Sequence, residues 1–305
     1  MEEKKDFRPS YLSLYESGLL KERVERLHEF LKSCALCPRR CGVDRTMGEK
    51  GYCGAAELPM VSSAFAHFGE ERPLVGVYGS GTIFLTHCNL KCVFCQNYDI
   101  SHEARGEVIS TEELAKQMIA LQAKGTHNIN FVTPTHYVPQ IVGALPRAVE
   151  MGLEIPLVFN CGGYESMDVI RLLEGIFDIY MPDYKFTDPK SAERYLDAPD
   201  YPDVVKAVLK EMHRQVGVLK VDSRGIATRG LLIRHLVMPG GEGESKRAFE
   251  FIAGELSPDS YVNVMEQYRP EYRASEFAEI ARTITGSEYI EAVRLARGAG
   301  LSRGF

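Results

Sequence analysis

The feature that most constrains the fold is an alternation, from about Gly79 onward, of short apolar runs with stretches of helical periodicity. Six runs have the length and composition of strands, at 82–85, 129–132, 156–160, 176–181, 231–237 and 261–265. Helical patterns separate them, near 140–151, 167–173, 203–215 and 245–256. Elements in this order are typical of βα units around a parallel sheet, so we expect an α/β fold.

Local signals support this pattern. Ser110 and Glu113 form a capping box at the start of a helix that we expect to end at Gly125. The segment 217–230, with a turn at 222–225, predicts a hairpin leading into the fifth strand. The tail at 275–295 has helical periodicity again.

A cysteine-rich segment precedes the βα units. The stretch 19–31 has apolar residues at the spacing of one helical face. Four cysteines follow, among glycines and a proline that favour compact turns: Cys34, Cys37, Cys41 and Cys53. We therefore predict two parts, an N-terminal helix with a four-cysteine metal-binding module in 1–70 and the main domain in 71–305.

Composition narrows the function classes. A chain of 305 residues, 45% hydrophobic and 26% charged, can bury one full core. A net charge of -6 provides no basic footprint for nucleic acid. The charged N-terminus lacks a following apolar segment, and no run reaches 18 apolar residues. We expect a cytoplasmic protein that neither enters a membrane nor binds nucleic acid, with its eight cysteines reduced.

The second cysteine cluster indicates the chemistry. Cys88, Cys92 and Cys95 have C-x3-C-x2-C spacing directly after an apolar strand, where parallel α/β folds place their active sites. Three thiolates leave one iron of a [4Fe–4S] cluster without a protein ligand. The amino and carboxylate groups of S-adenosylmethionine (SAM) can chelate that iron beside a low-potential electron donor. A zinc site completed by His87 or His102 is the alternative, and chance spacing without a metal is another.

These residues resemble the radical SAM enzymes, in particular those like the pyruvate formate-lyase activating enzyme, in its PflX-like branch. The resemblance covers nearly the whole chain. It is carried by CALCPRRCGVDR (34–45), GSGTIFLTHCNLKCVFCQNYDIS (79–101), VTPTHY (132–137), NCGGY (160–164), YMPDYKF (180–186), RGLLIRHLVMPG (229–240) and NVMEQYRP (263–270).

The resemblance implies a partial (β/α)6 radical SAM barrel with the small cysteine-rich module at its N-terminus. It implies reductive cleavage of SAM at a [4Fe–4S] cluster to a 5′-deoxyadenosyl radical, which abstracts hydrogen from a substrate. A reductant protein such as flavodoxin or ferredoxin would supply the electron, and a glycyl radical enzyme is one candidate substrate. Modification of a small molecule or another target is the second hypothesis. A non-catalytic metal or electron-carrier protein is the third.

The resemblance also assigns cofactor-binding residues around the triplet. Phe94 matches the aromatic position that lies against the adenine, with an apolar core role as its alternative, and Gln96 and Asn97 match neighbouring adenine contacts. The family places Gly-Gly-Glu at the end of the second strand to bind the methionine amino group, whereas this chain has Val-Thr-Pro-Thr at 132–135. Backbone carbonyls or the Thr133 hydroxyl could replace that contact.

Further residues match the cofactor site at later strands. Asp183 and Lys185 match an Asp-x-Lys in which the lysine reaches the cofactor carboxylate and the aspartate belongs to a cation site, the alternative being an exposed ion pair. Asn160 and Cys161 stand where that cation site has Asp and Thr, which weakens the case for a bound cation. Arg234, in an apolar strand, needs an anionic partner, and a cofactor carboxylate is a good one.

The N-terminal cysteines predict a second metal centre. Four thiolates saturate either a tetrahedral zinc or an auxiliary [4Fe–4S] cluster, and the spacing does not separate the two. Dependence of the main site on cluster assembly favours iron slightly. Cys161 is isolated, so we expect a small buried residue there.

Other polar residues lie in family-like stretches or at expected strand ends. His67 and His136 could donate protons or contact substrate, although a lone histidine is as often a structural hydrogen-bonding residue. Four more could line a substrate cavity by position alone: Tyr137, Tyr164, Tyr268 and Arg269.

Overall fold

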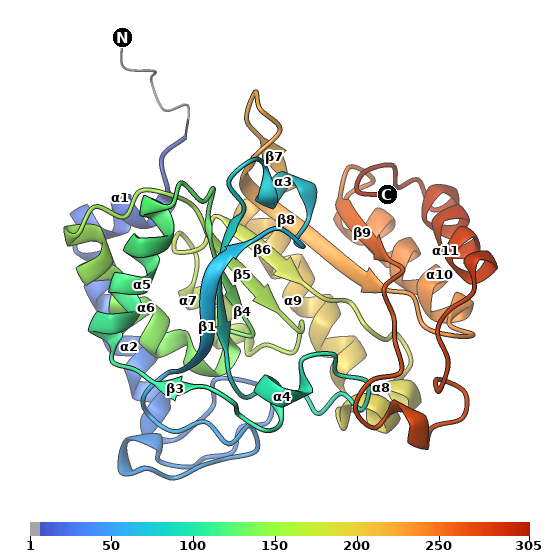
Figure 1. Ribbon diagram of the computed structural model, residues 1–305, viewed down its shortest axis with the longest axis horizontal. Coiled ribbons are helices and arrows are strands. Elements are labelled where there is room, and N and C mark those ends of the chain that lie inside the picture. The colour runs from blue at the N-terminus through green and yellow to red at the C-terminus, as the bar shows by residue number, and fades with distance from the viewer. Residues whose placement is uncertain (1–6) are drawn as a thin grey trace.

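The computed structural model describes residues 7–305, so the charged residues 1–6 lie outside the described part of the chain. Within that part, one nine-stranded sheet has the order β3-β1-β2-β4-β5-β6-β8-β7, with β9 paired to β8 (Figure 1). The strands are β1 (Met60–His67), β2 (Ser80–Leu85), β3 (Glu107–Val108), β4 (Ile129–Val132), β5 (Leu157–Cys161), β6 (Ile179–Pro182), β7 (Lys220–Val221), β8 (Ala227–Leu236) and β9 (Tyr261–Met265).

The sheet is mixed. Strands β2, β4, β5, β6, β8 and β9 pair in parallel, in chain order, and correspond to the six strands expected from the sequence. Strand β1 is antiparallel to β2, β3 is antiparallel to β1, and β7 forms the expected hairpin with β8. The α/β fold is confirmed, and the antiparallel strand β1 was missed.

Helices connect the strands. They are α1 (Ser10–Glu16), α2 (Leu19–Lys32), α3 (Arg72–Val75), α4 (Tyr98–Ser101), α5 (Thr111–Ala123), α6 (Val138–Glu150), α7 (Met167–Leu172), α8 (Pro189–Leu196), α9 (Tyr201–Val216), α10 (Glu242–Phe251) and α11 (Gly286–Gly298). Figure 1 shows α2, α5 and α6 gathered at one end of the sheet and α10 and α11 at the other. The expected capping box at Ser110 and Glu113 starts α5.

Several boundaries differ from expectation, and two of them have a local cause. The C-terminal helix begins at Gly286 rather than near 275, because Thr285 and Glu288 form a capping box there. The fourth strand begins at Ile179 because Gly175, at φ +81°, turns the chain just before it.

Among the described residues, four short helices were not expected from the periodicity: α1, α3, α4 and α8. Helix α8 is only eight residues long, and Asp188 caps it by accepting a hydrogen bond from the Ser191 amide at 3.0 Å. An aspartate three residues before that amide is an ordinary helix start, so the cap was a visible signal.

Alternation along the strands buries both faces of the sheet. Phe159 and Tyr180 belong to the larger core, which includes residues of α5, α6 and α9. Their neighbours Val158 and Ile179 belong to a smaller cluster on the other face. Burial on both faces explains why these strands are continuous apolar runs.

The N-terminal helices share the larger core. Tyr11, Leu20 and Leu27 are fully or almost fully buried within it. Ser10 donates to Asp178, just before β6, through both its amide (3.0 Å) and its hydroxyl (2.7 Å). Among the described residues, no helix is long and apolar enough to cross a membrane.

Candidate functional site

The loop that carries Cys88, Cys92 and Cys95 follows β2 and leads into α4. Its backbone is fastened at two points. The amide of residue 87 donates to the carbonyl of residue 100 at 2.9 Å, and the Val93 amide donates to the Tyr195 carbonyl at 3.0 Å. These bonds hold the cysteine loop at the carboxyl end of β2, where the sequence predicted a site.

The three thiols lie in a mostly buried environment. The Leu90 amide donates to Cys88 Sγ at 3.4 Å, and Cys95 Sγ lies 3.1 Å from Ser101 Oγ. Burial raises the pKa of Cys88 to about 12, and the neighbouring Cys95 contributes in the same direction. Burial likewise raises the pKa of Cys92, whereas a nearby lysine opposes the rise. Free thiolates are disfavoured here, so a bound metal would be needed to hold these sulfurs ionised.

The N-terminal cysteines lie in a segment of turns between α2 and β1. The Tyr52 amide donates to Cys41 Sγ at 3.3 Å, and a Cβ added at Gly51 would lie 2.8 Å from the same sulfur. Burial raises the pKa of Cys37 to about 12 and also raises that of Cys53, whereas backbone amides act to lower both. Amide donors aimed at sulfur suit metal-bound thiolates.

The two cysteine segments contact each other, which the sequence did not predict. Arg39, between Cys37 and Cys41, donates through Nε to the Asn89 carbonyl at 3.2 Å. A Cβ added at the glycine after Cys53 would lie 3.1 Å from Cδ2 of the histidine before Cys88. The ends of the two segments are therefore packed together.

Within residues 7–305, no three His, Cys, Asp or Glu side chains are gathered tightly enough to hold a metal ion. The donor chemistry of both cysteine segments nevertheless fits iron or zinc, since the sulfurs have amide donors and little solvent. Their assignment as ligands stays a prediction, and metal binding would draw the thiols of each segment together.

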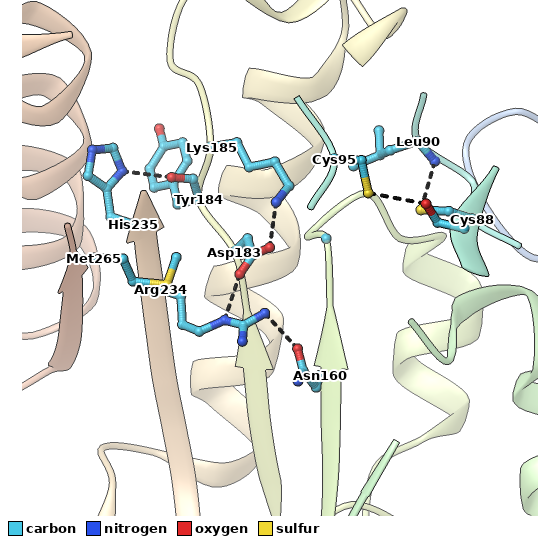
Figure 2. A network of polar contacts seen from close by, with 12 residues as sticks. Cys88, Leu90, Cys95, Asn160, Asp183, Tyr184, Lys185, Arg234, His235 and Met265 are labelled. Carbon is cyan, nitrogen blue, oxygen red and sulfur yellow. Dashed lines mark hydrogen bonds and ion pairs between the residues drawn. The ribbon is translucent and has the colours of Figure 1, made fainter. Parts of the chain in front are cut away.

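Asp183 is the centre of a buried charge network, shown in Figure 2. Its Oδ1 accepts from Arg234 Nε at 2.7 Å, and its Oδ2 accepts from Lys185 Nζ at 2.5 Å. Arg234 Nη2 also donates to Asn160 Oδ1 at 2.7 Å. Although burial acts to raise the pKa of Asp183, Arg234 and Lys185 together hold it below its usual range. The structure thus brings together four predicted residues from the ends of three neighbouring strands.

The partner of Arg234 differs from the one expected. We expected a cofactor carboxylate, whereas in the structure the guanidinium is bound to Asp183. Glu70, in the loop after β1, adds a second carboxylate 3.9 Å from Arg234 Nη1. Burial raises the pKa of Glu70, and Arg234 opposes the rise. Sequence reasoning missed Glu70 as part of this network because β1, the strand that precedes it, was not recognised.

Phe94, which the resemblance assigned to the adenine, is buried among aromatic rings. It is 5% exposed and packs against Phe186 and Tyr268, with ring centroids 6.0 Å away in each case. Phe94 therefore belongs to the apolar core, and its contact with adenine stays a prediction.

The other two residues assigned to the adenine have protein partners as well. Gln96 Nε2 donates to the Gln267 carbonyl at 2.8 Å. The Asn97 carbonyl accepts from the amides of Ile100 and Ser101 at α4. The two hydrogen bonds of Asn97 use its backbone carbonyl and not its side chain. A contact of Gln96 or Asn97 with adenine stays a prediction.

Thr133 has an unusual backbone. Its φ of +59° lies in the left-handed region, which is rare for a β-branched residue, and its amide donates to the Asn160 carbonyl at 2.8 Å. Nearby, the Thr135 hydroxyl donates to Glu165 Oε1 at 2.9 Å. Burial raises the pKa of Glu165 to about 7. Glu165 was missed because nothing in the sequence reveals that this carboxyl group is buried.

The two histidine candidates have partners within the protein. His136 is buried and donates through Nε2 to the Thr86 carbonyl at 2.7 Å, and burial lowers its pKa to about 3. His67 Nδ1 lies 3.4 Å from a carboxylate oxygen of Glu70, beside the Asp183 network. A neutral, hydrogen-bonded His136 fits a structural role, whereas His67 lies close to the candidate site.

The residues proposed to line a substrate cavity are mostly buried. The Tyr164 hydroxyl donates to an acidic side chain of α9's N-cap, Asp200, at 2.6 Å. The Tyr268 hydroxyl donates to a backbone carbonyl at 2.7 Å, and the Tyr137 hydroxyl lies 3.2 Å from a histidine ring. Arg269 is exposed. Cys161 is buried, as expected.

Comparison with solved structures finds partial likenesses. The structure of TYW1 with a lysine-pyruvate adduct matches at a TM-score of 0.48 and 12% identity, covering 71% of this chain and 73% of that one. The structure of anSMEcpe with bound AdoMet and the Cp18Cys peptide matches at a TM-score of 0.44 and 10% identity, covering 68% and 55%.

Comparison of sequences gives closer matches. Uncharacterized protein MJ0674 of Methanocaldococcus jannaschii is 35% identical over 295 residues, which cover 93% of this chain and 80% of that protein. Uncharacterized protein MJ0808 of the same organism is 25% identical over 166 residues, covering 49% and 48%. The model of the radical SAM superfamily matches residues 82–253, more than half of the chain. The chain belongs to the radical SAM superfamily.

Proposed function

We propose that this protein reductively cleaves SAM at a [4Fe–4S] cluster held by Cys88, Cys92 and Cys95 and abstracts hydrogen from a substrate. The observation that carries the proposal is a three-cysteine loop at the carboxyl end of β2, close to the buried Lys185 that follows β6. The influence of Lys185 on the pKa of Cys92 supports their proximity. Superfamily membership implies the same cofactor pair.

The cysteines would bind the cluster and leave one iron open for SAM, whose reduction supplies methionine and a 5′-deoxyadenosyl radical. The other predicted residues would bind SAM and orient it at the cluster. Lys185 places one cation near the cysteine loop, and Arg234 binds the same carboxylate of Asp183 from the other side. A cofactor carboxylate could replace part of their contact with Asp183. The low exposure of their side chains, 15% and 18%, limits access of water to these charges.

The amino group of SAM would be bound without the Gly-Gly-Glu of the family. Thr133 adopts the left-handed backbone that glycine ordinarily supplies. This conformation supports a turn at 132–135 that has the same backbone shape as the family's Gly-Gly-Glu turn, although this chain has no glycine there. Backbone carbonyls of 132–135, with the Thr133 hydroxyl, would bind the amino group.

The finer architecture is also a proposal. The run of six parallel strands from β2 to β9 supports a partial (β/α)6 barrel, preceded by a cysteine-rich module within 1–70. The amide donors at Cys37, Cys41 and Cys53 support a second metal centre in that module. We propose an auxiliary [4Fe–4S] cluster there, with structural zinc as the alternative.

The substrate is proposed by resemblance alone. Similarity of the motifs to activating enzymes favours a glycyl radical enzyme as the target, with flavodoxin or ferredoxin as reductant. Modification of a small molecule is the alternative, because one fold and one cofactor serve many targets.

Anaerobic reconstitution tests the proposal. The protein, reconstituted with iron and sulfide and reduced with dithionite, should convert SAM to 5′-deoxyadenosine, measured by liquid chromatography and mass spectrometry. Cys92→Ala should abolish the product and remove one cluster's iron. Lys124→Ala, at an exposed position after α5, is the control and should retain both. A wild-type protein with a full cluster and no product, with or without candidate substrates, would contradict the proposal.

A further inference from the structure

A groove of about 530 Å³ lies between α2 and α7, away from the Asp183 network. Phe30 and Leu172 give it an apolar floor. Its remaining lining residues are charged, three of them arginines: Arg23, Arg26, Arg171, Glu29 and Asp168. Arginines around apolar side chains are the composition of a protein docking surface.

The groove has an excess of positive charge. Glu29 is bound through both oxygens by Lys32, at 2.8 and 2.9 Å, and Asp168 is paired with Arg40 at 3.7 Å. Both carboxylates of the groove are therefore paired with cations other than its three arginines. Among the residues that the structure describes, no carboxylate lies within ion-pair distance of those three.

One carboxylate outside the groove, that of Glu211, interacts with a groove arginine at longer range. Arg171 contributes to lowering the pKa of Glu211, but Arg214 already binds that side chain at 2.8 Å. A chain of net charge -6 thus presents three available guanidinium groups in one place.

The groove adjoins the N-terminal cysteine segment. Helix α2, which forms one wall, ends at Lys32, two residues before Cys34. Figure 1 shows the loops that follow α2, residues 33–59, at the same end of the molecule as the end of that helix.

Two consecutive arginines connect the groove with both cysteine segments. Arg40, whose partner Asp168 lines the groove, directly precedes one of the N-terminal cysteines. Its neighbour Arg39 binds the Asn89 carbonyl, next to the first cysteine of the second cluster. A protein bound at the groove would therefore lie close to the residues around both sets of thiols.

We infer that this groove is the docking surface for an acidic electron-transfer protein. The inference rests on the proposed function, in which each SAM cleavage consumes one electron. The reduced donor loses that electron and the [4Fe–4S] cluster gains it. SAM then accepts it, and the bond from sulfur to C5′ breaks to give methionine and the radical. An acidic partner complements the three arginines and would place its redox centre beside the cysteine segments.

Reduction by flavodoxin tests the inference. The test protein is the reconstituted full chain, and the probe is photoreduced flavodoxin with an acidic surface. Arg23→Glu/Arg26→Glu/Arg171→Glu should slow one-electron reduction of the cluster, followed by its EPR signal, by about tenfold or more at low salt. The binding constant for flavodoxin, measured by calorimetry, should weaken in parallel. Raising the salt concentration should slow wild-type reduction and shrink the difference.

Two controls isolate docking from folding and chemistry. Lys124→Glu/Lys220→Glu/Arg297→Glu makes the same charge change at exposed positions elsewhere and should behave as wild type. Dithionite needs no docking surface, so it should reduce all variants equally. If the variant with three glutamates does not fold, Arg23→Gln/Arg26→Gln/Arg171→Gln takes its place in the test. Because it removes the positive charges without adding negative ones, we expect a smaller decrease in the rate of cluster reduction by flavodoxin.

The outcomes separate the inference from the proposed function. Flavodoxin binding and reduction at wild-type levels in the groove variants would overturn the docking surface. Loss of binding to a single-stranded RNA oligonucleotide in these variants, with flavodoxin reduction unchanged, would assign the groove to nucleic acid and overturn it too. Absence of 5′-deoxyadenosine from dithionite-reduced wild type would instead count against the proposed function, while flavodoxin binding would still decide the docking surface.

Discussion

Arg234 and Asp183 form a buried ion pair across the carboxyl ends of β8 and β6, with Nε 2.7 Å from Oδ1. The same two residues form a parallel backbone bridge, and the Tyr184 amide donates to the Arg234 carbonyl at 2.8 Å. The pair therefore fixes the side chains and the backbone of two neighbouring strands at once. Lys185 completes it as a second cation on the same carboxylate.

Asp183→Asn should destabilise the protein strongly, because two buried cations would lose their common anion. Breaking a buried pair from one side costs about 3–5 kcal/mol in the free energy of unfolding, measured by urea titration. The pKa of Asp183 is lowered in the folded state, so its stabilisation is present above the unfolded pKa and is lost as pH falls through the folded one.

Glu291→Gln is the matched control for that variant. Glu291 pairs with Arg294 at 2.6 Å on the surface of α11, where both side chains are solvated. Such a pair contributes about 0–1 kcal/mol. Equal losses of stability in the two variants would mean that the Asp183 network stabilises the fold no more than a surface pair does.

Thr133→Gly should stabilise the fold slightly. The left-handed backbone of Thr133 is strained for a β-branched residue, and relief of this strain outweighs the entropy cost of glycine by about 1 kcal/mol. Thr133→Ala, which keeps a Cβ, should show no such gain in urea titration. The affinity for SAM, measured by calorimetry on the reconstituted protein, should fall modestly in both if the hydroxyl contributes. An equal loss of stability in Thr133→Gly and Thr133→Ala would contradict the prediction that the Thr133 backbone is strained.

Glu165→Gln should change how stability depends on pH. An acid whose folded pKa is raised to about 7 favours the protonated form, so wild-type stability falls as pH rises from the unfolded pKa through about 7. The total decrease in the free energy of unfolding over this pH range is on the order of 3 kcal/mol. The substituted amide would keep an oxygen that accepts the Thr135 hydrogen bond, without the charge.

The measurement is urea unfolding of metal-free protein at pH 5 and pH 8. Glu165→Gln should come close to wild type at the lower pH and exceed it at the higher one. Glu193→Gln, at an exposed position on α8, should leave both values unchanged. A wild-type stability that does not fall between these pH values would contradict a buried, protonated Glu165.

Sequence periodicity was sufficient for the six parallel strands because they are largely buried and so contain short, mostly apolar runs. It was insufficient for β1, whose run Met60–His67 mixes apolar residues with serines near an edge of the sheet. The need of Arg234 for an anion followed from its apolar strand. The identity of that anion did not, because it depends on the register between β6 and β8.

Contacts between segments that are distant in the sequence were the second feature that could not be predicted from it. That Cys88 and Cys53 lie in adjoining segments depends on Arg39 reaching Asn89, a contact between residues fifty positions apart. The buried state of Glu165 likewise depends on a threonine thirty positions away. Motif spacing identifies the cysteines but contains no information on either contact.

Cys34→Ala/Cys37→Ala tests the second metal centre. If the N-terminal cysteines hold an auxiliary [4Fe–4S] cluster, the variant should lose about half of the iron of the reconstituted protein. The remaining cluster, held at Cys88, should still change its EPR signal when SAM is added, because its own ligands are intact. Iron and zinc are counted by mass spectrometry. Unchanged iron with loss of zinc would exclude the auxiliary cluster and assign the module a structural zinc, since closed tetrahedral thiolate coordination suits that ion.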